Sequence, residues 1–177
     1  MSSAEGTLTW TPAVDRPELV APPVAAALGA VPSARVAEID PELADTAAFC
    51  ETYRSAPEHS ANCVVVAGRR GGETRRAAVL VLASDRADVN GVVRRHLDVR
   101  KISFAPMDEA VELTGMAYGG ITPVGLPEGW RVLVDDAVVA AGDVVVGSGL
   151  RRSKLLVAAS ELAALPAAEV LALAQHA

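Results

Sequence analysis

Hydrophobic residues gather along the chain in short valine-rich runs, separated by glycine-rich or charged connections. The clearest pair covers residues 63–67 and 76–83, which Gly68-Arg69-Arg70-Gly71-Gly72 joins. Two such runs around a glycine-rich connection are typical of an antiparallel hairpin. Residues 77–83 include no polar side chain, whereas a strand with one wet face alternates. We therefore expect this strand to lie centrally in a sheet, covered on both faces.

Apolar positions three or four residues apart predict helices that cover the sheet. A stripe of Val89, Val92, Val93 and Leu97 predicts one of them, with Asp88 as its N-cap. Shorter helices are expected over residues 22–30, 45–53 and 106–114, and strands over residues 35–39, 101–104, 131–134, 143–146 and 154–157. One or two helices, capped by Ser160, are expected to close the chain. These elements indicate a mixed α/β domain.

A length of 177 residues fits one compact domain with a short appendage. We expect residues 1–17 to form a flexible leader and residues 18–177 to form the domain. The longest apolar run is far too short to span a membrane, and no basic region followed by an apolar stretch begins the chain. A cytoplasmic protein without membrane contact is therefore expected. Cys50 and Cys63 have no histidine at ligand spacing, so we expect no disulfide, metal or cofactor.

The net charge of −6 argues against nucleic-acid binding, but the distribution of charge favours it. Residues 69–101 carry nine basic and four acidic side chains, a local charge of +5, and a second basic cluster follows at residues 151–154. If both clusters share a face, they form a basic footprint for RNA. The alternative is a plain solvated surface. The candidates for nucleic-acid contacts are Arg94, Arg95, Arg151 and Arg152.

The heptapeptide Gly119-Gly120-Ile121-Thr122-Pro123-Val124-Gly125 has the composition of a binding site. Glycines tolerate positive φ and let a ligand approach the backbone, while Pro123 fixes its own φ and stiffens the loop. Successive N–H groups of such a loop can point at one oxygen, including the developing oxyanion of ester hydrolysis. A tight turn that binds nothing is the alternative.

Side chains suited to catalysis are scarce. The three histidines lie in unrelated contexts, no GxSxG segment occurs, and Cys63 begins a valine run that is typical of a core. A nucleophilic triad is therefore not indicated. Asp135 and Asp136 are adjacent at the end of a strand and point in opposite directions, which favours a turn or helix cap over an acid–base pair.

Five segments occur in a characteristic order. They are the hairpin from Asn62, residues 87–114 ending in Leu113-Thr114-Gly115, the glycine loop, Val132-Leu133-Val134-Asp135, and Val145-Val146-Gly147-Ser148-Gly149-Leu150-Arg151-Arg152. In this order they resemble the YbaK/ProX aminoacyl-tRNA deacylases, relatives of the editing domain inserted in bacterial prolyl-tRNA synthetases. The resemblance implies a single domain with a mixed, mostly antiparallel, barrel-like sheet surrounded by helices.

The resemblance also implies a pocket for the aminoacyl ester at the 3′ end of mischarged tRNA, which water hydrolyses without a protein nucleophile. It assigns Gly119, Gly120 and Thr122 as catalytic backbone donors and Asn62 as the residue that orients the substrate. The substrate-binding residues that it implies are Pro123, Asp135, Gly147, Ser148 and Gly149.

Asn62 departs from the family pattern, because many members carry a lysine at that position. Asparagine donates a hydrogen bond but supplies no charge. The first function expected is a trans-acting aminoacyl-tRNA deacylase that proofreads mischarged tRNA and associates weakly with a synthetase. The alternative is a non-catalytic module that binds the aminoacyl or tRNA end. A third possibility is hydrolysis of a small ester or amide unrelated to tRNA.

Overall fold

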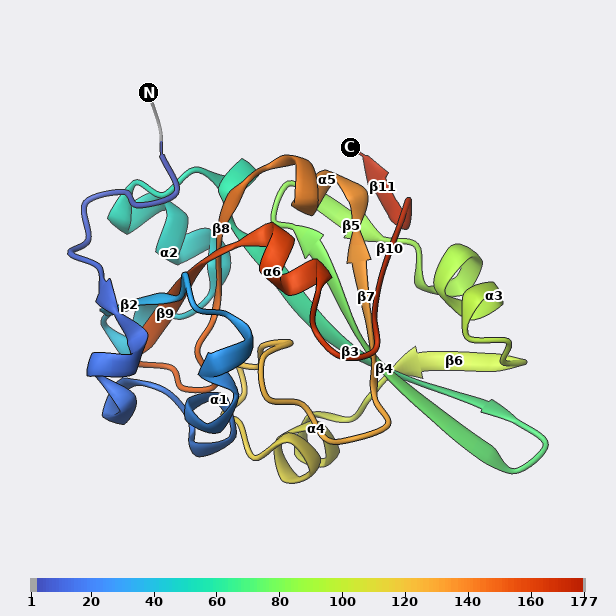
Figure 1. The fold of residues 1–177 in the computed structure, drawn as a ribbon. Coiled ribbons are helices and arrows are strands. Elements are labelled where there is room, and N and C mark those ends of the chain that lie inside the picture. Colours follow the sequence, from blue (N-terminus) through green and yellow to red (C-terminus); the bar gives the residue numbers. More distant parts are fainter. Residues whose placement is uncertain (1–2, 177) are drawn as a thin grey trace.

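A computed structural model describes residues 3–176, in which three β-sheets are packed with helices (Figure 1). In sheet order, the five-stranded sheet consists of β10 (Ala168–Leu171), β7 (Arg131–Asp135), β4 (Glu73–Leu82), β3 (Ala61–Arg70) and β6 (Lys101–Phe104). The four-stranded sheet consists of β1 (Thr11–Pro12), β2 (Arg35–Glu38), β9 (Ser153–Ala158) and β8 (Asp143–Gly147). The smallest sheet pairs β5 (Asp85–Ala87) with β11 (Ala174–His176).

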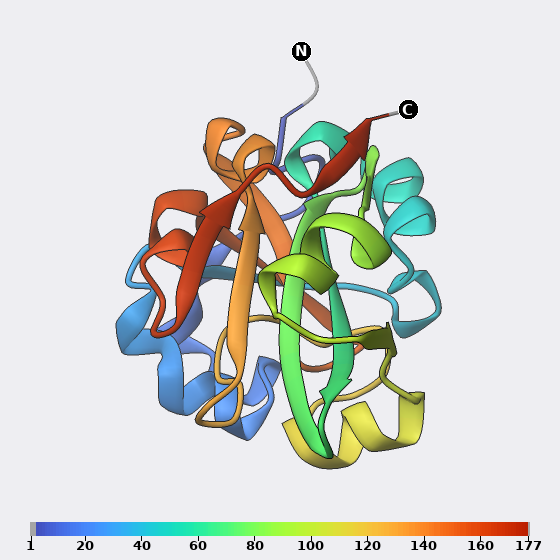
Figure 2. The ribbon, with the colours of Figure 1, turned by 90° about the vertical axis from the view of Figure 1, so that its right-hand side faces the viewer.

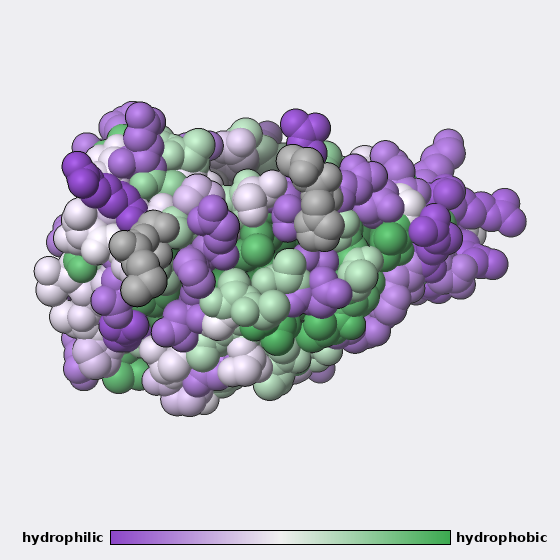
Figure 3. All heavy atoms as spheres, turned by 90° about the horizontal axis from the view of Figure 1, so that it is seen from above, coloured by the Kyte–Doolittle hydropathy of each residue, from purple (hydrophilic) through white to green (hydrophobic). Residues whose placement is uncertain are grey.

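The predicted hairpin is confirmed, and its strands are longer than expected. β3 and β4 pair from Ala61 opposite Leu82 to Arg70 opposite Glu73, which leaves Gly71 and Gly72 as the turn. Both glycines have positive φ, as a two-residue turn that follows the strand twist requires. The hairpin tip projects from the body (Figure 1), and hydrophilic side chains cover that end of the molecule (Figure 3).

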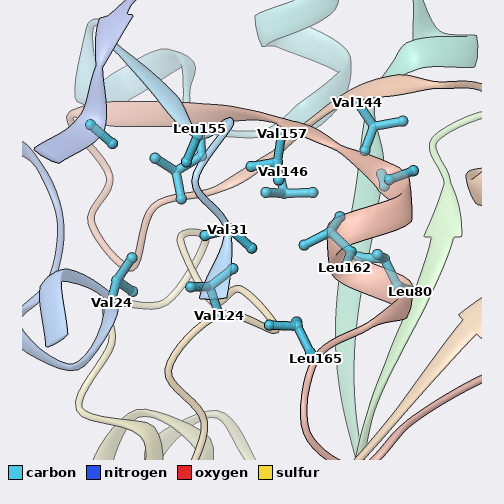
Figure 4. Close-up of a cluster of buried hydrophobic side chains, with 14 of the residues drawn as sticks. Val24, Val31, Leu80, Val124, Val144, Val146, Leu155, Val157, Leu162 and Leu165 are labelled. Carbon is cyan, nitrogen blue, oxygen red and sulfur yellow. The ribbon is translucent and has the colours of Figure 1, made fainter. Parts of the chain in front are cut away.

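The central position of β4 is also confirmed, because β4 lies between β7 and β3. The largest cluster of buried side chains fills the space between the two larger sheets, where residues from both point toward one another (Figure 4). On the other face of the five-stranded sheet, Val79 and Leu133 pack against Val93 and Leu97. The helical segment that carries these last two residues lies across that face (Figure 2). β4 is thus covered on both sides.

The helices lie near their predicted positions, apart from the one that begins at Asp136, which was not predicted. They are α1 (Pro22–Ala27), α2 (Thr46–Tyr53), α3 (Arg94–His96), α4 (Met107–Thr114), α5 (Asp136–Ala140) and α6 (Ala159–Ala163). Short 3₁₀ turns occur at Ala13–Asp15, Pro17–Leu19, Leu28–Ala30, Pro41–Leu43 and Pro57–His59. The predicted cap is confirmed: Asp88 accepts hydrogen bonds from the amides of Gly91 and Val92, although the first turn, Val89–Val93, is a π-helix. No helix within residues 3–176 is long and apolar enough to cross a membrane.

The strand pairing is mixed and mostly antiparallel, as expected, because β7 pairs in parallel with β4 and β10 while the other strand pairs are antiparallel. The sheets of the described residues are open at their edges, so the barrel-like form is not confirmed. The prediction of a further closing helix after α6 was wrong, because β10 and β11 form there. Ser160 lies inside α6 instead of capping it. Pairing with β7 and β5 outweighs the helix propensity of an alanine-rich tail.

The segment that we set apart as a leader contacts the rest of the chain. β1 pairs with β2, Ala13 is fully buried, and Leu8 and Trp10 pack against a cluster around Phe49 of α2. A domain boundary after residue 17 stays a prediction. Residues 1, 2 and 177 lie outside the described residues.

Asp135 joins three elements at the end of β7. Its side chain is 1% exposed. One carboxylate oxygen accepts the amides of Leu173 and Ala174 at 3.0 and 3.1 Å, and the other accepts the amide of Ala137 in α5 at 3.2 Å. The expected helix cap is therefore confirmed, and the same carboxylate also holds the connection between β10 and β11.

Replacing Asp135 by alanine should lower the free energy of unfolding by about 3 kcal/mol, because three backbone N–H groups lose their acceptor. Asp136→Ala is the matched control, since Asp136 is exposed. Urea unfolding of both variants measures the difference. Equal stability of the two variants would contradict the structural role of Asp135.

Candidate functional site

A cleft of about 760 Å³ opens where the start of β3, the N-terminus of α2, the connection from β6 to α4 and the glycine loop meet. β8 and β9 also contribute to its wall. The lining residues that matter for its chemistry are Asp45, Asn62, Gly119, Ile121, Gly147 and Lys154.

Backbone contacts hold the glycine loop against the turn between β8 and β9. Gly149 donates to the carbonyl of Gly120 at 2.6 Å and accepts from the amide of Ala117 at 2.8 Å. A Cβ atom at Gly147 would lie 2.5 Å from the carbonyl oxygen of Gly120, so only glycine permits this approach. The loop is therefore a fixed wall of the cleft, although it has few side chains with which to anchor itself.

The predicted set of backbone donors needs correction. The amide of Gly120 already donates to the carbonyl of Ala117 at 2.9 Å. The amide of Thr122 donates to Met116 Sδ at 3.5 Å. Thr122 is also fully buried and does not line the cleft. By contrast, Gly119 and Ile121 line the cleft, and their amides have no hydrogen-bond partner within residues 3–176. The available donors are thus Gly119 and Ile121.

The structure brings together only part of the predicted substrate-binding set. Gly147 lines the cleft, whereas Gly149 supports the loop from behind. Ser148 is buried, and its hydroxyl bonds to the hydroxyl of Ser153 at 2.7 Å. Pro123 is buried outside the lining, and Asp135 is occupied by backbone amides elsewhere. We find that Ser148 and Gly149 shape the site without lining it.

The side chain of Asn62 is oriented by its neighbour. Thr46 Oγ1 donates to Asn62 Oδ1 at 2.6 Å, and the NH₂ group of Asn62 has no hydrogen-bond partner among residues 3–176. Both residues line the cleft. Asn62 is therefore placed as a hydrogen-bond donor at this wall, where we predicted it to orient a substrate.

Exposed apolar side chains surround the mouth of the cleft. Phe104 is 62% exposed, Tyr118 56% and Met107 49%, and all three belong to the lining. Large apolar groups in water around a concave site are typical of a surface that a ligand covers. Two of the three are aromatic and offer flat faces for stacking.

A second cleft, of about 740 Å³, shares the segment from β6 to α4 with the first. It is basic, because Arg69, Arg94, Arg100 and Lys101 line it. Of the four predicted tRNA contacts, Arg94 lies here, while Arg95 lines neither cleft.

Arg151 belongs to the first cleft, where its guanidinium donates to the carbonyls of Tyr118 and Pro41 at 3.2 and 3.1 Å. Arg152 donates to the carbonyl of Glu18. Residues 69–101 thus supply the basic cleft, whereas Arg151 and Arg152 are bound to backbone carbonyls. A single basic face shared by the two clusters stays a prediction.

Comparison with protein families identifies the domain. The model of the aminoacyl-tRNA editing domain matches residues 40–165, which is more than two thirds of the chain. The chain belongs to the aminoacyl-tRNA editing domain family. The suspected resemblance is thereby confirmed.

Curated relatives of this editing domain include proline–tRNA ligases. The chain is 37% identical over 71 residues to the enzyme of Lactobacillus gasseri and 32% identical over 71 residues to that of Listeria monocytogenes. Each alignment covers 40% of this chain but only 13% and 12% of the respective ligase. The chain therefore matches a small part of the length of these ligases.

Among solved structures, a candidate trans-editing enzyme for prolyl-tRNA synthetase has a similar fold. The TM-score is 0.73 at 23% sequence identity, and the match covers 88% of this chain and 99% of that protein. The mixed α/β fold of the editing domain is thus shared over nearly its whole length.

Lys154 is a cleft residue that we did not predict as part of the site, because its neighbours at residues 151–154 suggested a basic surface. Its side chain is buried: Nζ donates to the carbonyl of Ala44 at 2.8 Å and lies 5.5 Å from the centroid of the Phe49 ring. It forms no ion pair with a carboxylate of residues 3–176. Burial lowers the pKa of Lys154 to about 8. A lysine within the apolar strand Ser153–Ala158 was the available signal.

Cys63 also lines the cleft but is not a nucleophile. Burial raises the pKa of its thiol to about 12, so the thiol stays protonated near neutral pH. Since the thiolate is the reactive form, Cys63 contributes packing instead of covalent chemistry. This agrees with the absence of a triad in the sequence.

The buried lysine should make stability depend on pH. Between pH 8 and 10.5 Lys154 is neutral when folded but protonated when unfolded, so the free energy of unfolding rises with pH in this window. The rise amounts to about 3 kcal/mol. The protonated thiol of Cys63 acts in the opposite direction above pH 9, its ordinary pKa.

The contribution of Lys154 is therefore measured as a difference between the native protein and Lys154→Met. Urea unfolding at pH 7, 8, 9 and 10.5 should show the native protein gaining stability relative to the variant as pH rises. The pKa of Lys154 also depends on electrostatic interactions with Asp45, Cys50 and Arg151. These three residues are the same in the native protein and in the variant. A difference that is constant across these pH values would contradict the lowered pKa.

Proposed function

We propose that this editing domain hydrolyses the ester of mischarged aminoacyl-tRNA in trans. The observation that carries the proposal is the pair of unpartnered amides, Gly119 and Ile121, in a loop that backbone contacts hold against the cleft. Membership of the editing family and similarity to a candidate trans-editing enzyme support it. A weak association with a synthetase belongs to the same proposal, because such an enzyme meets tRNA soon after mischarging.

The chemistry needs few side chains. Water adds to the acyl carbon, negative charge develops on the carbonyl oxygen, and the amides of Gly119 and Ile121 donate hydrogen bonds to it. The carbon–oxygen bond to the ribose then breaks, and the ribose oxygen takes up the proton that the attacking water loses and leaves as an alcohol. Donors fixed before reaction stabilise such an oxyanion without reorganisation. The protonated thiol of Cys63 is consistent with attack by water instead of a protein nucleophile.

The surroundings of the cleft suit the 3′ end of a tRNA. The bases of single-stranded RNA stack on exposed aromatic side chains, and Phe104 and Tyr118 provide these at the mouth. In this proposal the adjacent basic cleft, with Arg69, Arg94 and Arg100, contacts phosphates of the acceptor stem. A tRNA contact by Arg94 is thus proposed there, and one by Arg151 at the first cleft.

A non-catalytic binding module is the second candidate. Asn62 favours it, because the residue supplies no charge at the position where many family members carry lysine. The same cleft then holds an aminoacyl end without turning it over.

A deacylation screen over mischarged tRNAs separates these candidates. We expect turnover of at least one aminoacyl-tRNA, with kcat/KM falling steeply between about 50 and 200 mM salt because phosphate contacts release counterions. Saturable binding of all tRNAs without turnover would favour the binding module. Hydrolysis of small esters with no dependence on salt would instead indicate a substrate other than tRNA.

The loop can be tested at Gly119. A Cβ atom there would meet the guanidinium of Arg151, and φ is +83°. Gly119→Ala should therefore lower kcat/KM by about tenfold or more through displacement of the amide donors. Gly120 is less suitable, because its added Cβ would lie 2.6 Å from the backbone oxygen of Leu150 and would disturb the fold.

Gly129→Ala is the matched control for backbone strain. Gly129 has a φ of +85°, and nothing lies within 4 Å of an added Cβ. Both variants should lose stability on the order of 1 kcal/mol from the left-handed conformation, as thermal unfolding reports. Only Gly119→Ala should lose deacylation. Equal activity of the two variants would exclude the loop from catalysis.

A further inference from the structure

The cleft contains a buried lysine that forms no ion pair with a carboxylate of residues 3–176. Lys154 is 6% exposed, and its ammonium has three N–H groups, of which one donates to Ala44. The ring of Phe49 partly compensates the charge. Asp45 lines the same cleft but forms no ion pair with Lys154. Burying an ammonium without a carboxylate partner is costly, so an oxygen from a ligand would complete its surroundings.

Asn62 presents a second donor to the same space. Its oxygen is occupied by Thr46, which leaves the NH₂ group available. The fold brings Asn62 and Lys154 to one region although they are far apart in sequence. Ser60 bridges to Val145, which places the start of β3 beside β8, and Gly147 of β8 lies opposite Lys154 of β9. Asn62, Gly147 and Lys154 all line the cleft.

We propose that Lys154 and Asn62 form a subsite that selects aminoacyl groups with a side-chain oxygen, a hydroxyl or a carboxylate. The inference rests on the proposed function. Two donors require an acceptor, and the ester carbonyl is already assigned to the amides of Gly119 and Ile121. The α-amino group is cationic and is repelled by Lys154. The nucleoside belongs at the exposed mouth with Phe104 and Tyr118, so the remaining acceptor is on the acyl side chain.

Binding of non-hydrolysable probes tests the subsite independently of turnover. The probes are 3′-aminoacylamino-3′-deoxyadenosines in two pairs of matched shape: threonyl with valyl, and aspartyl with leucyl. Isothermal titration calorimetry of the native protein should give at least one oxygen-bearing probe a Kd about tenfold lower than that of its apolar match. Preference in the first pair identifies a hydroxyl, and preference in the second identifies a carboxylate. No preference in either pair would overturn the proposal.

Lys154→Met then assigns the preference to the lysine. The ratio of the two Kd values should fall to within about twofold of unity, because methionine fills similar space without a donor. Lys101→Met is the matched control and should keep the native ratio, since Lys101 lines the other cleft. An unchanged ratio in Lys154→Met would overturn the role of the lysine. Circular dichroism and thermal unfolding verify that both variants are folded, and the probe pairs on the native protein remain decisive if one is not.

Turnover distinguishes failure of this inference from failure of the proposed function. If the probe preference is present and depends on Lys154, the subsite stands even when no mischarged tRNA is hydrolysed, and only the deacylase proposal falls. If threonyl- and valyl-tRNA, and aspartyl- and leucyl-tRNA, are hydrolysed at equal rates within each pair and the probes bind equally, the deacylase stands and the subsite is overturned.

Discussion

The site depends on one backbone contact, between the glycine loop and the turn that follows β8. Gly149 both donates to Gly120 and accepts from Ala117, while Gly147 lies against the carbonyl of Gly120. A side chain at Gly147 would push the two segments apart, since an added Cβ there would lie 2.5 Å from the carbonyl oxygen of Gly120. A loop with few side chains cannot hold its own geometry. Its neighbours must do so, and here they do it through main-chain hydrogen bonds.

This contact divides the amides of the loop into two groups. The amides of Gly120 and Thr122 donate to partners in the protein, and those of Gly119 and Ile121 have none in the part of the chain that the structure describes. The first group gives the loop its shape, and the second group is left for a ligand. Electrostatic catalysis requires this combination, because donors that must first rearrange lose most of their advantage. The scarcity of titrating side chains around the loop then agrees with the chemistry.

The site also contains a positively charged residue that was not predicted to belong to it. The start of β3 carries Asn62, yet the cleft still contains a lysine, which arrives from β9. Lys154 is held by Ala44 and Phe49 at the N-terminal end of α2, where burial disfavours its charged form. Such a residue weakens the fold near neutral pH. Functional sites often carry this kind of cost, since groups that suit a ligand are incompletely satisfied without it.

Local patterns in the sequence were sufficient for most elements. The hairpin, the central strand and the Asp88 cap follow from runs of valine, glycine positions and an aspartate before an apolar stripe, because these signals act over a few residues. The family was recognised from a resemblance in the order of five segments along the chain. Tertiary structure decided what depends on distant partners. β10 and β11 form because they pair with the edges of β7 and β5. Asp135 is bound to the backbone that connects β10 and β11. Contact with Gly149 fixes the loop, so that some of its amides are engaged and others are available. In the sequence, the neighbouring Arg151 and Arg152 suggest that Lys154 is a surface charge. In the fold, strands β2 and β8 flank Lys154 and the start of α2 covers it. Spacing along the chain carries no information about such burial, which arises only when separate sheets meet.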